Sequence, residues 1–305
     1  MKASTVVLGL FLSCTTIITL WGNLVVLIAF FMTKKLRTTF TFYLINLAIT
    51  DAAVALTAMS FYTFDVILGY WPFGEFMCGV WIFFDYGMTF ASVFTLVSIS
   101  VDRLWAVKRP IQYKQHSTKK RVIYIIIVCW AAVLAVWLGP CIKDRLDYTE
   151  PNVCKWEPNN HPEFVIFIAS VGHHLPCFLI LVCYFSVAIK MKRTVSSLTN
   201  DQIVERKRIK EKKAFATLSY VVLAYAVCWI PFHFIFDLSA VDMKLVPEWL
   251  YTATFWMTYL NSTFNPFVYA FSNKDMRKAI VKILFCKNKA EPVSTETDAN
   301  IATVN

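Results

Sequence analysis

Uncharged stretches long enough to cross a lipid bilayer recur along the whole chain. The first of them, Ser4–Met32, holds no charged residue, is too long for a signal peptide and lacks a small-residue cleavage site. A helix of about 20 apolar residues spans the hydrocarbon core of a membrane. Hydrophobic residues make up 57% of the chain and charged residues 16%, against about a quarter charged in soluble domains. These stretches predict an all-α membrane protein.

Seven spanning helices are predicted, followed by a short amphipathic helix. The spanning ranges are about 4–32, 40–68, 78–108, 122–140, 164–191, 212–238 and 247–271. The amphipathic helix would lie along the inner membrane leaflet, because one of its faces is apolar and the other is basic. We expect a seven-transmembrane domain at 1–272, a juxtamembrane helix at 273–286 and a disordered cytoplasmic tail at 287–305. Cys286 is a candidate for palmitoylation, with a plain free thiol as the alternative.

The basic residues are sorted by loop. The chain carries 30 lysines and arginines and a formal net charge of +10, and most of these side chains follow the first, third, fifth and seventh predicted helices. The positive-inside rule places those loops in the cytoplasm and the N-terminus outside the cell. We therefore expect a multi-pass protein of the plasma membrane, in contact with lipid and not with nucleic acid. The outer loops carry more acidic than basic residues, which favours a cationic ligand.

A single carboxylate interrupts the third apolar stretch. Asp85 stands near one end of this stretch, and Asp102 with Arg103 closes the other end, a rise of roughly 25 Å at 1.5 Å per residue. A lone charge inside a membrane is costly and marks a functional site by default. The alternative is an ion pair with a basic residue on another helix, but no other apolar stretch contains a lysine or arginine. We expect the positive charge to come from a ligand.

Most of the nine cysteines lie inside apolar stretches and are expected to be small buried hydrophobes. Cys78 opens the third helix on the outer side, and Cys154 lies in an outer loop, where oxidising conditions permit a disulfide. Cys141, at the end of the fourth stretch, is a competing partner. A disulfide between the first two would hold the loop over the mouth of the bundle.

Seven short motifs follow one another in the order of the helices. They are Asn23, Leu47–Asp51, Asp102-Arg103-Leu104, Trp130, Pro176, Cys228–Pro231 and Asn265–Tyr269. Together they resemble the rhodopsin family of G-protein-coupled receptors over nearly the whole chain. The resemblance implies a seven-helix receptor that signals to a heterotrimeric G protein, with arrestin as a further partner. It implies neither catalysis nor an organic cofactor.

Within that family the chain resembles receptors for amines. Asp85 stands where that branch places its amine-binding aspartate, and Tyr86 follows it as in muscarinic acetylcholine and histamine receptors. The resemblance therefore implies an acetylcholine-like or histamine-like cationic ligand, held by the carboxylate and by aromatic faces. Aromatic residues at helical spacing can also be mere packing. The implied ligand-binding residues are Asp85, Tyr86, Thr89, Trp137, Trp229, Phe232, His233, Phe255 and Tyr259.

The chain departs from the amine-receptor pattern on the fifth and sixth helices. Ile168, Ala169 and Gly172 replace the hydroxyl-bearing residues that catecholamine and serotonin receptors typically carry, which argues against a catechol ligand. Histamine receptors usually have Asn or Glu where Gly172 stands, which weakens that option as well. His233 replaces a muscarinic Asn and could bind an ester or imidazole, or simply pack between helices. His173 is followed by another histidine, so at most one of the two faces inward.

The resemblance also implies an activation mechanism. Its residues are Asp102, Arg103, Glu211, Tyr184, Pro231, Asn265, Pro266 and Tyr269. An allosteric sodium ion is implied at Asp51, Ser92, Asn261, Ser262 and Asn265. Leu104 and Tyr225 depart from the usual residues, so the resting activity stays open. The alternatives are a non-signalling or orphan receptor with a non-amine ligand, and a secondary transporter. A transporter should show repeats and interrupted helices, and none is visible.

Overall fold

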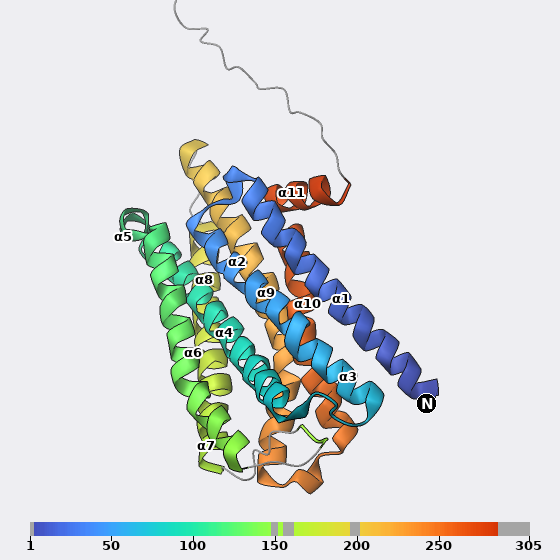
Figure 1. Ribbon diagram of the computed structural model, residues 1–305. Coiled ribbons are helices and arrows are strands. Elements are labelled where there is room, and N and C mark those ends of the chain that lie inside the picture. The colour runs from blue at the N-terminus through green and yellow to red at the C-terminus, as the bar shows by residue number, and fades with distance from the viewer. Residues whose placement is uncertain (1–2, 148–151, 155–161, 196–201, 286–305) are drawn as a thin grey trace, which may run out of the picture.

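The computed structural model describes residues 3–147, 152–154, 162–195 and 202–285, and all regular structure in these ranges is helical (Figure 1). The α-helices of the bundle are α1 (Ala3–Met32), α2 (Thr39–Val54), α3 (Ser60–Leu68), α4 (Gly74–Lys108), α6 (Lys119–Asp147), α7 (Pro162–Ile168), α8 (Leu175–Val195), α9 (Gln202–Val241) and α10 (Glu248–Ser272). The remaining elements are η1 (Lys34–Leu36), η2 (Ala55–Met59), α5 (Pro110–His116), η4 (Ala169–His174), η5 (Met243–Leu245) and α11 (Lys274–Leu284). The predicted all-α fold is confirmed.

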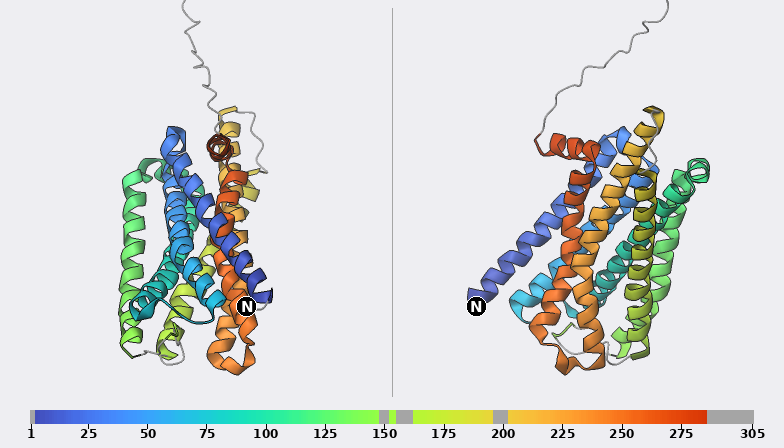
Figure 2. Two further views of the ribbon diagram at one scale, coloured as in Figure 1. Left: turned by 45° about the vertical axis from the view of Figure 1, so that its right-hand side comes forward. Right: turned by 180° about the vertical axis from the view of Figure 1, so that it is seen from behind.

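The long helices form one bundle, in which α4 runs through the middle and packs against α2, α6, α8 and α9. α10 packs against α9 and α1. The right-hand view of Figure 2, from behind, shows α9 and α10 at the front. Six spans of the described chain, with α2–α3 and α7–α8 each counted as one, are long and apolar enough to cross a membrane. The remaining long helix, α10, is less apolar because it buries polar residues such as Asn261 and Asn265 inside the bundle.

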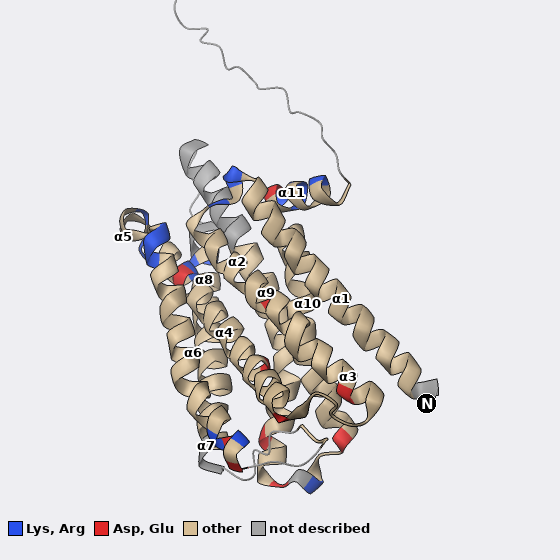
Figure 3. Cartoon of the chain, in the orientation of Figure 1, with Lys and Arg blue, Asp and Glu red and all other residues tan. Residues whose placement is uncertain are grey.

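The two ends of the bundle differ in charge. One end carries α5, η1 and α11, and Figure 3 shows lysines and arginines gathered there. We call it the α11 end. The opposite end carries the start of α1 and the disulfide between Cys78 and Cys154, and we call it the disulfide end. The sorting of basic residues along the sequence therefore corresponds to a sorting in space.

Two spans that were predicted as continuous helices contain a wider, π-helical turn. In η2, the hydroxyl of Ser60 donates to the carbonyl of Ala55, five residues earlier, at 2.8 Å. In η4, the widened turn directly precedes Pro176, whose ring has no N–H and would clash with the carbonyl of Gly172 in a regular helix. Each wider turn changes the face that the following residues present to the interior.

Three other boundaries differ from the sequence prediction. α6 continues past Pro140 to Asp147, since a proline inside a helix removes one hydrogen bond without ending the helix. α9 begins at Gln202, within a segment that was predicted as loop. α5 was not predicted, and it begins with Pro110, a residue suited to the first turn of a helix.

The core is divided between two apolar clusters. One joins α2, α4, α9 and α10 and includes Leu47, Ile99 and Tyr269. The other lines the disulfide end and includes Trp81 and Trp137. Buried polar residues lie between the apolar ones along α4 and α10, so polar groups are present inside the bundle.

Candidate functional site

Asp85 lies on α4 and is only 5% exposed. Its carboxylate accepts a hydrogen bond from the hydroxyl of Tyr259 on α10, with an O···O distance of 2.8 Å. Among the residues that the structure describes, it forms no ion pair. A buried carboxylate with one neutral hydrogen-bond donor retains most of the cost of leaving water. When ionised, this carboxylate has no cationic partner among the described residues.

Aromatic rings from four helices pack against one another near this carboxylate, which Tyr86 follows in the sequence and to which Tyr259 donates. Tyr86 of α4 packs on Trp137 of α6, with ring centroids 4.7 Å apart. On α10, Phe255 lies 5.3 Å from Tyr259 and 5.5 Å from Phe232 of α9. The structure thus brings together predicted residues that are far apart in the sequence. Thr89, one helical turn from Asp85 on the same face of α4, is half-buried.

Four further aromatic residues belong to this wall and were missed in the sequence. Tyr62 lies 5.6 Å from Trp256 and 6.0 Å from Trp81, centroid to centroid. Tyr251 stacks on Phe255, with planes 8° apart. Its position four residues before Phe255 on the same helix face was a usable signal. Tyr62 and Trp81 gave no such signal, because they lie on different helices and meet only in the folded bundle.

A pair of histidines lies on the other side of the site. His173 of η4 and His233 of α9 stack with centroids 4.6 Å apart and planes 14° apart, and each is 6% exposed. His174 points away, with its side chain 53% exposed and 3.3 Å from Asp237. Only one of the adjacent histidines therefore faces inward. Within the described chain, no group of three or more His, Cys, Asp or Glu side chains is placed to hold a metal ion.

Phe90 fills the space in front of Gly172. A Cβ atom added to this glycine would lie 1.9 Å from Cε1 of the Phe90 ring, which is far inside van der Waals contact. The same ring stacks on His173, with centroids 6.5 Å apart. The missing side chain at position 172 is therefore replaced by an aromatic ring from α4, and the fifth helix offers no hydroxyl there.

Cys78 and Cys154 form the disulfide, with their Cα atoms 5.5 Å apart. Cys141, the competing candidate, is a buried free thiol. The segment next to the disulfide is also held by a backbone hydrogen bond of 2.8 Å from the amide of Trp71 to the carbonyl of Asn152. The predicted bridge is confirmed, and it links residues 152–154 to the start of α4.

A second carboxylate, Asp51 of α2, is fully buried in the middle of the bundle. It accepts hydrogen bonds of 2.7 Å from the hydroxyl of Ser262 and from the side-chain amide of Asn265. Asn261 is buried on the same helix. The hydroxyl of Ser92, another predicted neighbour, donates instead to Thr50 at 2.9 Å. The structure gathers part of the predicted set around the carboxylate.

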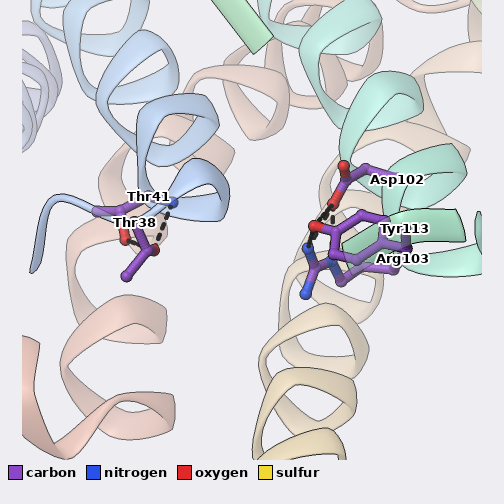
Figure 4. A network of polar contacts seen from close by, with 5 residues as sticks. All are labelled: Thr38, Thr41, Asp102, Arg103 and Tyr113. Carbon is purple, nitrogen blue, oxygen red and sulfur yellow. Dashed lines mark hydrogen bonds and ion pairs between the residues drawn. The ribbon is translucent and has the colours of Figure 1, made fainter. Parts of the chain in front are cut away.

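Arg103, at the α11 end, contacts Asp102, Tyr113 and Phe40, and Figure 4 shows the first two of these contacts. Its guanidinium pairs with Asp102 and donates to the hydroxyl of Tyr113 at 2.7 Å. The same hydroxyl donates to Asp102 at 3.0 Å, which closes the triangle. The guanidinium also lies 4.4 Å above the ring of Phe40. Tyr113 was missed because α5 shows no apolar pattern, and the side chain of Glu211 lies outside the described residues.

The other residues implied in activation lie on α8, α9 and α10. Tyr269 is fully buried, and Tyr184 stacks on Phe215 with centroids 5.7 Å apart. Pro231 and Pro266 lie inside α9 and α10, respectively. Cys286 lies outside the described residues.

Comparison with known proteins places the chain in a family. Residues 22–269 match the model of the rhodopsin family of seven-transmembrane receptors. The chain is 30% identical to the octopamine receptor beta-1R of Drosophila melanogaster over 298 residues, which cover 86% of this chain and 58% of that protein. It is 28% identical to the alpha-1A adrenergic receptors of mouse and human over 317 residues, which cover 92% of this chain and 68% of each of those proteins.

The chain thus spans between 58% and 68% of the length of these relatives. The family match extends from α1 to the end of α10 and includes Asp85, Arg103 and the Asn265–Tyr269 motif. Its members are receptors and not enzymes. The chain therefore belongs to the rhodopsin family of seven-transmembrane receptors.

Proposed function

We propose that this receptor binds a small cationic amine between the helices at the disulfide end and activates a heterotrimeric G protein at the α11 end. The observation that carries the proposal is the environment of Asp85, a buried carboxylate that meets one hydroxyl and no cation among the described residues. An ammonium group would supply the missing charge. The relatives that carry amine names support the same reading.

The pocket chemistry suits an amine. A charge-assisted hydrogen bond between an ammonium and a carboxylate is strong when water is excluded. The aromatic rings of Tyr86, Phe255 and Tyr259 present faces that attract alkylated cations. The acidic residues of the outer loops would raise the local concentration of such ligands. Affinity and selectivity for cations follow from the same set of residues.

The fifth helix restricts which amines can bind. The two groups of relatives are named for octopamine and for adrenergic ligands. Position 172 carries no side chain, and Phe90 fills its space, so a catechol would find no hydroxyl partner there. These relatives do not single out acetylcholine or histamine, and that narrower expectation stays a prediction. We favour an amine with at most one ring hydroxyl.

Signalling would require movement of α9. Its interior Pro231 makes the helix bendable, and Trp229 lies near the proposed ligand, 5.7 Å from His233 and 6.4 Å from Phe232. A bend that moves the inner half of α9 outward would open the α11 end for the G protein. In this proposal the basic α11 end faces the cytoplasm, and the same opening serves arrestin.

Asp51 suits a sodium ion as an allosteric ligand. Its carboxylate and the hydroxyl of Ser262 are hard oxygen donors, and Asp51 has no cationic partner among the described residues. The side-chain amide of Asn265 now donates to the same carboxylate, so it would hold the carboxylate in place rather than bind the ion. Bound sodium would neutralise the buried charge of Asp51.

The decisive experiment measures agonist-stimulated nucleotide exchange on a G protein, in membranes that contain the receptor. The panel contains octopamine, adrenaline, acetylcholine and histamine, tested on the native chain, on Asp85→Asn and on Asp242→Asn. Asp242 is an exposed carboxylate at the same end and serves as the matched control. We expect at least one amine to act, with its potency reduced about 100-fold or more by Asp85→Asn only. Equal potency on Asp85→Asn would overturn the proposal.

A further inference from the structure

The stacked imidazoles of His173 and His233 are a polar feature that the contact between the amine and Asp85 leaves unused. Both side chains are more than nine-tenths buried. Within the described part of the chain, Nδ1 of His173 and Nε2 of His233 have no hydrogen-bond partner. Buried polar groups in native proteins are nearly always paired, so an unpaired nitrogen calls for an explanation. Here two such nitrogens lie on adjacent rings.

The surroundings of the pair are aromatic. The rings within 6.5 Å of the His173 centroid, apart from His233, are those of Phe90, Trp229, Phe232 and Phe236. None of these phenylalanines offers a conventional hydrogen-bonding group, and the indole N–H of Trp229 is itself without a partner. The carboxylate of Asp237, four residues after His233 on α9, pairs with the exposed His174. The ring of His233 also lies 6.4 Å from Tyr225, whose hydroxyl has no partner in the described chain, and 6.3 Å from His174. The pair is therefore a small polar region among mostly aromatic side chains.

The pair belongs to the same site as Asp85 but lies on its other side. Phe232 touches His173, with centroids 5.9 Å apart, and also touches Phe255. Phe255 touches Tyr259, which donates its hydrogen bond to Asp85. One continuous aromatic wall thus connects the carboxylate on α4 and α10 with the imidazoles on η4 and α9. A ligand lying along this wall would have a polar partner at each end.

We propose that His173 and His233 bind the end of the amine ligand opposite its ammonium, and that this end carries one neutral group able both to donate and to accept a hydrogen bond, such as a ring hydroxyl. This proposal rests on the amine function proposed above. A neutral imidazole has one donor and one acceptor nitrogen, so a hydroxyl fits either tautomer. The position is buried and lies apart from the carboxylate of Asp85, so a charged group there would retain most of the cost of leaving water.

The inference also accounts for the glycine at position 172. Because Phe90 occupies the space of a side chain there, no hydroxyl from this position can bind the ligand. The histidine that follows it, His173, is turned into the interior within the π-helical turn η4 and lies against α9. In this proposal the hydrogen-bonding side chain of the fifth helix is at position 173 instead of 172, and His233 of α9 provides a second one.

The test compares three amines that differ only in the ring substituent: phenethylamine, tyramine, which adds a hydroxyl, and 4-methoxyphenethylamine, which accepts but cannot donate. Their potencies in nucleotide exchange are measured on the native receptor, on His173→Phe, on His233→Phe and on His174→Phe. We expect tyramine to be about tenfold more potent than the other two on the native chain. The preference should disappear in the first two variants and persist in His174→Phe, which alters an exposed neighbour.

The ratio of two potencies in the same membranes does not depend on how much variant receptor folds. Should a phenylalanine variant give no response to any amine, His173→Gln and His233→Asn replace it, since their amides retain part of the hydrogen bonding. The inference would be overturned if the tenfold preference for tyramine persisted in both histidine variants, or if the native receptor showed no such preference. If Asp85→Asn leaves every response unchanged, or no amine acts, the proposed function fails and this inference fails with it. If the responses depend on Asp85 but show no preference for tyramine, this inference is wrong and the proposed amine function stands.

Discussion

Gly172 shows how one absent side chain shapes the proposed pocket. The ring of Phe90 stands where a Cβ atom would be, and it also supports the imidazole of His173. Interiors are packed as densely as organic crystals, so the two positions must change together. A side chain at 172 is compatible with this backbone only if Phe90 moves or becomes smaller.

We therefore expect a smaller side chain at position 90 to compensate for a side chain added at position 172. Gly172→Ser should lower the free energy of unfolding by about 1–3 kcal/mol through overpacking, and Phe90→Thr in the same chain should restore part of that loss. Thermal unfolding of the purified receptor in detergent measures both. Gly139→Ser is the matched control, because nothing lies within 4 Å of a Cβ atom at that position. A Gly172→Ser receptor as stable as the control would contradict the packing argument.

Sequence reasoning reached Asp85 but not the contact between Phe90 and Gly172. A charge in an apolar stretch is costly wherever the neighbouring helices lie, so its importance can be read from the sequence alone. Contact between two side chains depends instead on the course of η4, whose wider turn decides which residue faces α4. The inward direction of His173, rather than His174, has the same origin. Local backbone geometry was the missing information.

At the scale of elements, α5 packs against the end of α4 and holds Arg103 and Asp102 there through hydrogen bonds. Its Tyr113 joins Arg103 and Asp102 through one hydroxyl, and its ring packs edge-on against Trp105, with centroids 5.0 Å apart. The long helices were predictable because the thickness of the bilayer sets their length. α5 was not, since seven residues with no apolar period give no such signal. Its role becomes visible only from the contacts it makes.

We expect Tyr113→Phe to raise G-protein activation in the absence of ligand, by up to about tenfold. The change removes one hydroxyl and two hydrogen bonds, each worth about 1 kcal/mol, and leaves the packing of the ring in place. Ligand-independent nucleotide exchange measures the effect. Tyr124→Phe, at an exposed position on α6, is the control and should match the native chain. Unchanged or lower basal exchange in Tyr113→Phe would show that α5 does not restrain Arg103.

At the scale of the whole molecule, the disulfide links the start of α4 to the segment that contains Cys154. Its two cysteines are 76 residues apart, so loop-closure entropy gives an upper bound of roughly 4.5 kcal/mol for its contribution to stability. Cys154→Ser and Cys78→Ser should lower the unfolding temperature by the same amount, and the double variant by no more than either. Cys141→Ser, which alters a free buried thiol, should have a much smaller effect. Additive losses in the double variant would mean that the two cysteines act separately.

The buried carboxylates Asp51 and Asp85 lie in one bundle, so a ligand at one can be coupled to a ligand at the other. By thermodynamic linkage, if sodium favours the state that binds the amine weakly, the amine must weaken sodium binding by the same factor. We expect amine affinity to be lower in sodium chloride than in potassium chloride at equal ionic strength, measured by equilibrium binding. Asp51→Asn should abolish the difference, since it removes the charge.

Two serines allow this coupling to be assigned to the geometry. Ser262 donates to Asp51, whereas Ser92 donates to Thr50. Ser262→Ala should therefore reduce the difference between the two salts more strongly than Ser92→Ala, although both remove one buried hydroxyl. If the two substitutions act equally, Ser92 turns toward the carboxylate when sodium binds. If the difference survives Asp51→Asn, the cation acts elsewhere, and the coupling between the two carboxylates must be abandoned.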